Sequence, residues 1–381
     1  MSRFERLHVQ GFRRLLDVDL ELRPLCVVIG ANGCGKTSLL DVFSLLAASA
    51  TSNLSQKISS MGGLSSILTL DRAQSINLGM QMAVPTNTPL RYGLSISPLG
   101  VGYEIATEVL SQPLESTSQT FTHFQAQHGD VRYAVPDQGL VRPTWQYDPI
   151  ETALSQVPKV SREPEYLRHS LASCTYYHGL SVDHLSPVRL PQPLRPATLP
   201  GRNGEDLVSC IFSMRENDRN RFDALEDSLR AAFRGFQRLD FPPVAAGTLA
   251  MTWREASFTR PLYMHQLSEG TLRFLWLATL LQSPGLTAVT LLDEPEVSLH
   301  PELLSLLAGL MREASARTQI VVATHADRLV RFLDPNEVLT LDVADDGMAT
   351  ATWADQLDLE QWLQEYTLDE VWRLGRMGGR P

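Results

Sequence analysis

The chain has 381 residues, 43% of them hydrophobic, which is enough for a sizeable core in one large domain with an insertion or in two or three domains. It contains no run of about 18 apolar residues and its first residues lack the pattern of a signal peptide, so we expect neither a membrane protein nor a secreted one. The formal net charge of −10 argues against a surface that coats nucleic acid throughout, while a local basic groove for DNA stays compatible with it.

The cysteines indicate a reducing environment. Cys26, Cys34, Cys174 and Cys210 show neither a CxxC pair nor the spacing of a metal site. Cys34 lies inside a glycine-rich segment, where a disulfide would obstruct the loop. We therefore expect a cytoplasmic protein.

An antiparallel hairpin is expected at the N-terminus. Apolar and polar residues alternate over residues 7–9 and again over residues 18–22, with a turn near residues 11–14 between them. The hairpin leads into residues 25–29, a continuous apolar run that is typical of a buried parallel strand.

The next segment, Gly30–Thr37 with the sequence GANGCGKT, fits the pattern GxxxxGK[ST] of a phosphate-binding loop, and residues 38–43 after it have helical character. In such a loop the backbone N–H groups converge on the β-phosphate of ATP. Lys36 adds a positive charge over the β- and γ-phosphate oxygens, and Thr37 offers its hydroxyl to Mg²⁺. The residues expected to bind the nucleotide here are Gly30, Asn32, Gly33, Cys34, Gly35, Lys36, Thr37 and Ser38.

Chance alone would place this pattern in about one chain in a hundred of this length. The composition strengthens the functional interpretation, because only three of the 33 basic residues are lysines, namely Lys36, Lys57 and Lys159. A planar guanidinium cannot replace a compact ammonium between phosphates, so a lysine in the loop indicates a role in phosphate binding.

Residues 51–264 contain no nucleotide motif and are expected to form an inserted α+β lobe. Residues 90–96 and 103–109 have strand character, whereas the prolines of residues 186–204 predict an extended connector without helix. Residues 205–238 predict two helices. The apolar residues on one helical face of this part are Phe222, Leu225, Leu229 and Phe233.

Arginines are frequent over residues 189–238, and aspartates and glutamates interleave with them. We interpret this pattern as a solvated, salt-bridged helix surface. A DNA-binding face is the alternative and the less favoured one.

The last third of the chain returns to alternating strands and helices. Residues 288–292 and 319–323 are apolar runs typical of buried parallel strands, with a helix predicted between them over residues 302–316. Residues 1–50 and 265–345 are therefore expected to form one discontinuous ATPase domain of the α/β class with a mixed sheet.

Residues 346–381 are expected to add a hairpin strand and a helical tail. Leu359, Trp362, Leu363 and Tyr366 follow one another at helical spacing. The spacing from Thr367 to Glu370 is that of a capping box, which predicts a further short helix ending at Gly375.

Asp293 and Glu294 end the strand over residues 288–292, at the sheet edge where the phosphate loop also lies. Asp293 is expected to hold Mg²⁺, commonly through a water, and Glu294 to orient and deprotonate the water that attacks the γ-phosphate. His325 follows the next strand and is expected at the same edge, in contact with the γ-phosphate or the attacking water. His300 has two open interpretations, a cap of the following helix or a contact with a neighbouring subunit.

The segment Leu267–Gly270 begins a strongly apolar helix. Taken alone, Ser268 would be only the N-cap of that helix. A helix N-terminus also attracts phosphate, and the segment lies between the phosphate loop and Asp293 in the sequence. This order favours a nucleotide-binding role for Ser268 and Gly270.

The motifs in this order resemble those of the ABC-type ATPases, and within them the RecF, SMC and OLD-like ATPases of DNA repair and anti-phage defence. The chain looks most similar to compact bacterial AAA family predicted ATPases. The shared motifs are GFRRL at Gly11–Leu15, LSEG at Leu267–Gly270, LDEPEVSLHP at Leu292–Pro301, ATH at Ala323–His325, and a tail from Trp362 to Trp372. The resemblance covers both ends of the chain and little of its middle.

This resemblance implies a P-loop head that forms a head-to-tail homodimer, or a higher even oligomer, around two ATP molecules. The phosphate loop of one protomer would meet Ser268 and Gly270 of the other, so that ATP binding closes the dimer and hydrolysis opens it. It also implies that Arg13 reaches the nucleotide and that a glutamine of the early insert contacts the metal. The sequence does not choose among Gln56, Gln74 and Gln81.

Departures from the family pattern narrow the expected function. The signature reads LSEGT rather than the LSGGQ of transporter ATPases, so transport is not expected. The chain lacks the long heptad arms and the CxxC hook of chromosome-tethering relatives. Only 56 residues follow His325 (381 minus 325), which would leave no room for the nuclease domain of OLD-like proteins.

We therefore expect a Mg²⁺-dependent ATP-hydrolysing switch that controls a separate effector, a nuclease or a toxin, in anti-phage defence. The alternative is a RecF-like ATP-dependent clamp on DNA. A scaffold that binds ATP without turnover is a third interpretation, against which Glu294 argues because a scaffold needs no catalytic acid.

Overall fold

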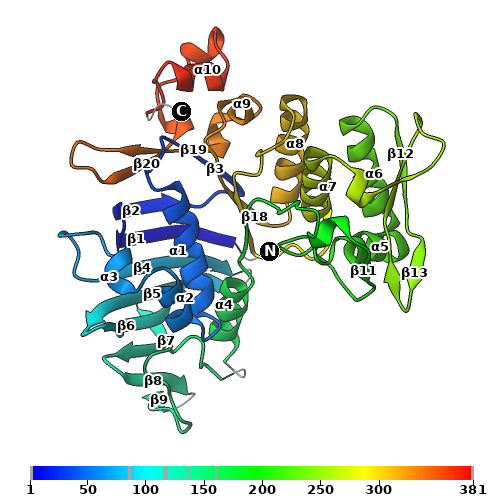
Figure 1. Cartoon of the computed structure of the whole chain (residues 1–381). Helices are drawn as coiled ribbons and strands as arrows, with labels where there is room; N and C mark the ends of the chain where they lie inside the picture. Colours follow the sequence, from blue (N-terminus) through cyan, green and yellow to red (C-terminus); the bar gives the residue numbers. More distant parts are fainter. Residues whose placement is uncertain (1–2, 85–86, 115–118, 136–137, 159–160, 379–381) are drawn as a thin grey trace.

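The fold is described from a computed structural model and covers residues 3–84, 87–114, 119–135, 138–158 and 161–378 (Figure 1). A six-stranded sheet lies at its centre, with the strand order β10-β17-β18-β3-β19-β20. The strands are β3 (Leu25–Ile29), β10 (Thr175–Tyr177), β17 (Val289–Asp293), β18 (Gln319–Ala323), β19 (Val338–Val343) and β20 (Ala349–Trp353). Neighbouring strands are parallel except for β19 and β20, which form a hairpin. The expected α/β class with a mixed sheet is confirmed. The sheet combines strands from both ends of the chain with β10, which comes from the segment expected to form the inserted lobe.

Strands β3, β17 and β18 are continuously apolar because both of their faces are covered. Cys26 and Val28 of β3 face one hydrophobic cluster. The alternate residues Leu25, Val27 and Ile29 face a second cluster on the other side of the sheet. The strand thus has no solvent side for polar residues to occupy.

The expected N-terminal hairpin is the edge of a larger antiparallel sheet, with the strand order β2-β1-β4-β5-β6-β7-β8-β9. Its strands are β1 (Arg3–Phe12), β2 (Leu15–Glu21), β4 (Ile76–Val84), β5 (Asn87–Leu99), β6 (Gly102–Pro113), β7 (Thr120–Gln127), β8 (Asp130–Val135) and β9 (Gly139–Val141). β1 pairs with β4 over most of its length. This sheet therefore contains strands from both sides of the domain boundary expected at residue 50.

Helix α1 (Lys36–Ser49) packs between the two large sheets, with α2 (Leu54–Ser60) and α4 (Arg162–Ala172) beside it (Figure 1). Leu39 and Phe43 of α1 belong to the same hydrophobic cluster as Val9 of β1 and Val28 of β3. A four-residue helix, α3 (Leu64–Ile67), follows α2 and precedes β4. The phosphate loop is thus fixed at its C-terminal end by a helix that is buried between sheets.

The other face of the central sheet is covered by four helices, which Figure 1 shows to the right of β18. They are α5 (Leu207–Asn217), α6 (Arg219–Ala232), α7 (Glu269–Gln282) and α8 (Leu304–Ser315). Two helices were predicted over residues 205–238, and Asp218 separates them by accepting a hydrogen bond from the backbone N–H of Arg221. Of their predicted apolar face, Phe222, Leu225 and Leu229 are buried. Phe233 lies just past α6, with its ring centroid 5.3 Å from that of Trp253.

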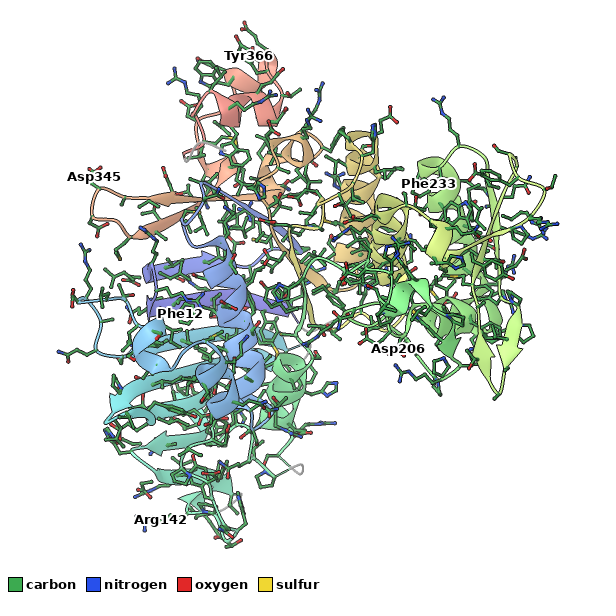
Figure 2. The ribbon with its side chains drawn as sticks, in the orientation of Figure 1. Phe12, Arg142, Asp206, Phe233, Asp345 and Tyr366 are labelled. Carbon is green, nitrogen blue, oxygen red and sulfur yellow. The ribbon has the colours of Figure 1, made fainter. Side chains whose placement is uncertain are left out.

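Two small sheets complete this helical side. Their strands are β11 (Gln192–Pro193), β13 (Pro243–Ala245) and β14 (Thr248–Leu249) in one, and β12 (Phe236–Asp240), β15 (Thr252–Glu255) and β16 (Leu262–Tyr263) in the other. Asp206 and Phe233 mark this part of the molecule in Figure 2.

The arginines of residues 189–238 are largely engaged in ion pairs. The pairs are Arg195–Asp206, Arg215–Glu216, Arg219–Asp223, Arg221–Asp218, Arg230–Glu226, Arg230–Asp227 and Arg238–Asp240. This surface matches the salt-bridged interpretation rather than the DNA-binding one.

Two local predictions were wrong. The connector was expected to lack helix, but it contains a short 3₁₀ helix at Pro187–Arg189. Proline is tolerated at the first helical position because the N–H that it lacks would have no partner within the helix there. The helix expected over residues 359–366 is reduced to a 3₁₀ turn at Trp362–Gln364. Leu363 and Tyr366 are exposed, so this spacing does not mark a buried face.

The end of the chain otherwise follows the prediction. A short helix, α9 (Asp327–Val330), follows β18, and α10 (Leu368–Arg373) begins with the predicted capping box of Thr367 and Glu370. Within the described residues, no helix combines the length and apolar character needed to span a bilayer. The four cysteines are buried free thiols.

Candidate nucleotide site

The phosphate loop connects β3 to α1, which begins at Lys36. Gly30 has a φ of +150°, and a Cβ there would lie 2.1 Å from the carbonyl oxygen of Leu341 in β19. No other residue fits this position, because the obstacle is backbone and cannot move aside. The loop is therefore held against the neighbouring strand where it leaves the sheet.

Lys36 is buried, and its Nζ donates hydrogen bonds to two carbonyl oxygens of its own loop. The distances are 2.8 Å to Gly30 and 3.0 Å to Ala31. A buried ammonium needs such partners, because leaving it unpaired would cost several kcal/mol. The lysine is thus held over the loop in position for a phosphate.

Cys34 is fully buried in the cluster between the two sheets. Burial raises the pKa of its thiol, so the group stays protonated and unreactive. Its side chain serves packing, and its Sγ would lie 2.8 Å from a Cβ on Gly30 of the same loop.

The phosphate loop, Arg13 and Glu294 line one open pocket with a volume of about 320 Å³. The chain segments that meet there are far apart in the sequence. The lining residues are Arg13, Arg14, Asn32, Gly33, Gly35, Lys36, Thr37, Ser38 and Glu294. The pocket therefore brings together most of the residues expected at the nucleotide.

Arg13 lies at the rim of this pocket in an ion pair. Its Nη1 is 2.7 Å from Oδ2 of Asp41 in α1. Its backbone has a φ of +47°, which few residues other than glycine adopt. The turn between β1 and β2 thus presents the guanidinium beside the phosphate loop, and Asp41 holds it there.

Asp293 ends β17 and contacts the end of the neighbouring strand β10. The hydroxyl of Tyr176 donates a hydrogen bond of 2.8 Å to Oδ2 of Asp293, and Nδ1 of His178 lies 3.7 Å from the same oxygen. Burial, followed by this hydrogen bond, raises the pKa of Tyr176, so the phenol remains a donor. Among the described residues, none makes a hydrogen bond to Oδ1, which is left open for a ligand.

Tyr176 and His178 were not identified from the sequence. Tyr176 lies in β10, which has three residues, too few for a periodic pattern, and His178 directly follows this strand. The expected glutamine is not found at this place. Gln56, Gln74 and Gln81 do not line the phosphate-loop pocket, and Gln81 instead donates to Glu5 at 2.8 Å across the antiparallel sheet.

Glu294 and His325 are brought together as expected. Oε1 of Glu294 is 2.9 Å from Nδ1 of His325, and both side chains are about half exposed. Glu294 has a φ of +49°, and its N–H donates to the carbonyl oxygen of Ala323 in β18. The strand end thus turns sharply, and the carboxylate stands at the sheet edge beside the histidine.

Glu296 supports this pair from the interior. Thr324 donates its hydroxyl to one carboxylate oxygen of Glu296, while the other oxygen is buried with no partner among the described residues. Burial raises the pKa of Glu296 and favours its protonated form. The backbone N–H of Ala326 donates to the same threonine, so the segment that carries His325 is fixed from below.

Ser268 and Gly270 lie outside the phosphate-loop pocket. Ser268 caps α7 by accepting a hydrogen bond of 3.1 Å from the N–H of Thr271. A Cβ on Gly270 would lie 2.8 Å from the carbonyl oxygen of Ser298, and the Ser298 hydroxyl donates to Glu269. The start of α7 is thus packed against the segment that follows Glu294.

His300 caps the 3₁₀ helix Pro301–Leu303 by accepting a hydrogen bond of 3.4 Å from the N–H of Glu302. The capping interpretation of this residue is therefore confirmed. The subunit-contact interpretation stays a hypothesis, and the largely exposed side chain is compatible with it.

Residues 25–331 match the protein family described as "AAA domain, putative AbiEii toxin, Type IV TA system". The chain belongs to this AAA domain family. The matched range contains the phosphate loop, the start of α7, Glu294 and His325, which are the parts that form the candidate site.

The chain is also similar to one known protein in sequence and to two solved structures in fold. A stretch of 42 residues, 11% of the chain, is 48% identical to the OLD nuclease of Thermus scotoductus and spans 8% of that protein. The structure resembles an SMC head bound to the C-winged helix domain of ScpA, with a TM-score of 0.58, 14% identity and coverage of 95% and 99% of the two chains. An Smc head with an extended coiled coil, bound to the C-terminal domain of ScpA from Pyrococcus furiosus, gives a TM-score of 0.56, 12% identity and coverage of 96% and 99%.

These likenesses show the fold, a P-loop ABC-type head. Together with the family match, they agree with the resemblance to the RecF, SMC and OLD-like ATPases that the motifs indicate.

Proposed function

We propose that the protein is a Mg²⁺-dependent ATPase that closes as a head-to-tail homodimer, or a higher even oligomer, around ATP. The observation that carries this proposal is the make-up of the phosphate-loop pocket. Lys36 and Glu294 line it, whereas Ser268 and Gly270 do not. A pocket with a phosphate cradle and an acid, but without the signature residues, corresponds to one half of a composite site.

The residues of the phosphate loop would bind the triphosphate. Lys36 would exchange its hydrogen bonds to Gly30 and Ala31 for bonds to phosphate oxygens. Arg13 would remain at the rim through Asp41 and add charge near the γ-phosphate. Ser268 and Gly270 of a second protomer would cover the opposite side.

The hydrolytic step would be carried by the ends of β17 and β18. Mg²⁺, when bound, neutralises charge on the β- and γ-phosphates, and the Thr37 hydroxyl and Oδ1 of Asp293 would hold it. Glu294 would accept the proton of the attacking water. His325 would orient that carboxylate through its 2.9 Å contact.

We further propose that the dimer controls a separate effector in anti-phage defence. The family description names a toxin of a toxin–antitoxin system, and the related OLD protein is a nuclease. A toxin or a nuclease is therefore the class of partner to seek.

The substitution Glu294→Gln tests the proposed mechanism. It should lower ATP turnover by at least about a hundredfold while ATP still binds, because only the proton acceptor is lost. Light scattering after size exclusion should then show a dimer with ATP and Mg²⁺. Lys36→Ala is the matched control and should stay monomeric, since it lacks the phosphate contact. A Glu294→Gln protein that remains a monomer with ATP and Mg²⁺ would show that the dimer proposal is wrong.

The alternative function is a RecF-like clamp on DNA. Turnover measured with and without duplex DNA, at several salt concentrations, separates the two. Strong stimulation by DNA together with salt-sensitive binding would favour the clamp. Unchanged turnover, with a second protein that copurifies, would favour the effector switch.

A further inference from the structure

A second pocket, with a volume of about 530 Å³, lies beside the nucleotide site. It is bounded by the C-terminal half of α1, by α2, by the end of α4, by β10 and the residues that follow it, and by the loop that contains Arg202 and Asn203. Helices α1, α2 and α4 lie together in Figure 1. Its volume is within the range of about 300–1,000 Å³ that is usual for small-molecule sites.

The pocket is lined by many hydrogen-bond donors. Lys57 and Arg202 are its permanently charged side chains, and its side-chain amides are those of Asn53, Gln56 and Asn203. None of the described residues that line it is acidic. This is unusual in a chain with a net charge of −10 and only three lysines.

The charges of the two cations are poorly compensated. Nζ of Lys57 is 4.0 Å from Oδ1 of Asp41, whose other oxygen is already held by Arg13 at 2.7 Å. Arg202 makes neither a hydrogen bond nor an ion pair within the described part of the chain, although most arginines of the neighbouring helical side do. Two such cations lining one pocket create a positive potential that attracts an anion.

We propose that this pocket binds a phosphate-bearing small molecule of nucleotide size. Lys57 and Arg202 hold its phosphate, and the amides of Asn53, Gln56 and Asn203 hold its remaining polar groups. A guanidinium and an ammonium in one pocket suit phosphate oxygens, because the guanidinium binds them in pairs and the ammonium acts as a point charge.

The pocket shares side chains with the nucleotide site. Tyr176 and His178 form part of its wall and both contact Asp293. Asp41 connects Lys57 in this pocket to Arg13 in the other. An anion that draws Lys57 away leaves Asp41 to Arg13 alone, so the bound ligand acts on the rim of the ATP site.

Acetylation of Lys57 measures binding in this pocket separately from binding at the phosphate loop. The full chain is treated briefly with an acetylating reagent at low salt, with increasing pyrophosphate as the probe, and acetylation of Lys57 is quantified by mass spectrometry. Lys57 is 27% exposed, so it reacts when the pocket is empty. Pyrophosphate should protect Lys57, and the protection should persist in Lys36→Ala, where the phosphate loop no longer binds.

The substitution Arg202→Gln provides the decisive comparison. It should raise the pyrophosphate midpoint for protection of Lys57 by at least about tenfold, the effect of losing one charged hydrogen-bond partner. Arg260→Gln, at an exposed arginine outside the pocket, is the matched control. Because acetylation measures binding, the result does not depend on ATP turnover or on dimer formation.

Two outcomes overturn the proposal. One is a Lys57 that stays reactive in the presence of millimolar pyrophosphate, or whose protection is the same in Arg202→Gln as in the unmodified protein. The other is protection by a single-stranded DNA oligonucleotide but not by pyrophosphate, which would assign the cations to a nucleic-acid backbone.

Discussion

Glu108 of β6 is a buried carboxyl group that fastens a distant loop to the antiparallel sheet. It accepts hydrogen bonds from the N–H groups of Ala153 and Leu154, at 2.6 and 2.9 Å, and from the hydroxyl of Tyr92. Burial raises its pKa from 4.5 to about 7, although these hydrogen bonds work in the opposite direction. The carboxyl group therefore changes its charge near neutral pH.

This pKa gives the protein a specific pH dependence. The folded chain binds the proton more tightly than the unfolded chain, so this group's contribution to stability is complete below pH 4.5 and is lost as the pH rises to about 7. The full effect is at most about 3 kcal/mol, at 1.36 kcal/mol per pKa unit. Glu108→Gln removes the titration while keeping an acceptor.

Urea unfolding at about pH 5 and about pH 8 measures the difference. The unmodified protein should lose about 2 kcal/mol of unfolding free energy relative to Glu108→Gln over this range. An equal change in both proteins would mean that Glu108 does not titrate between these values.

Gln319, the first residue of β18, joins the two large sheets. Its side chain accepts a hydrogen bond from the N–H of Phe4 and donates one to the carbonyl oxygen of the same residue, both at 2.7 Å. Both residues are buried. The glutamine thus takes the place of a backbone partner for β1 at the point where its pairing with β4 is irregular.

The substitution Gln319→Leu should leave two backbone groups buried without partners. The expected loss is about 2–6 kcal/mol of unfolding free energy, at about 1–3 kcal/mol for each of the two groups. Chemical denaturation measures it, with Gln237→Leu at an exposed position of β12 as the control. A loss no larger than that of the control would show that the two bonds are not stabilising.

The elements with strong local patterns were predictable from the sequence, and those fixed by distant contacts were not. The apolar runs of β3, β17 and β18 predicted buried parallel strands because both faces of the central sheet are covered. β10 has three residues, so its place in that sheet depends on pairing with β17 and left no sequence signal. The apolar spacing over residues 359–366 gave a wrong prediction of a helix with a buried face. Trp362 packs against the core, but Leu363 and Tyr366 face solvent.

The candidate site was predictable to a similar degree. The phosphate loop, Asp293, Glu294 and His325 follow motifs, and the structure brings them to one sheet edge. Asp41, Tyr176 and His178 were missed, because their roles arise from contacts across the fold rather than from spacing.

At the scale of the whole molecule, the proposed composite site predicts complementation. Lys36→Ala and Ser268→Arg should each abolish ATP turnover alone. An equal mixture should recover about a quarter of the unmodified rate, since half the dimers would be mixed and each would keep one intact site. Turnover in the mixture is measured by phosphate release.

The matched control for this experiment is a mixture of Lys36→Ala with Glu294→Gln. Both residues line the same pocket, so no pairing of these chains restores a complete site. Recovery in the control, or none in the first mixture, would contradict the composite arrangement.

The turn from Glu294 to Ser298 has left-handed backbone at both ends, with φ values of +49° and +64°. One end holds the proposed proton acceptor of its own nucleotide, and the other touches Gly270 and Glu269, which in the proposed dimer face the partner's nucleotide. This short segment therefore connects the two nucleotide sites of the proposed dimer directly. Each protomer would then sense the state of both nucleotides, so ATP bound at one site would change the affinity of the other site for ATP.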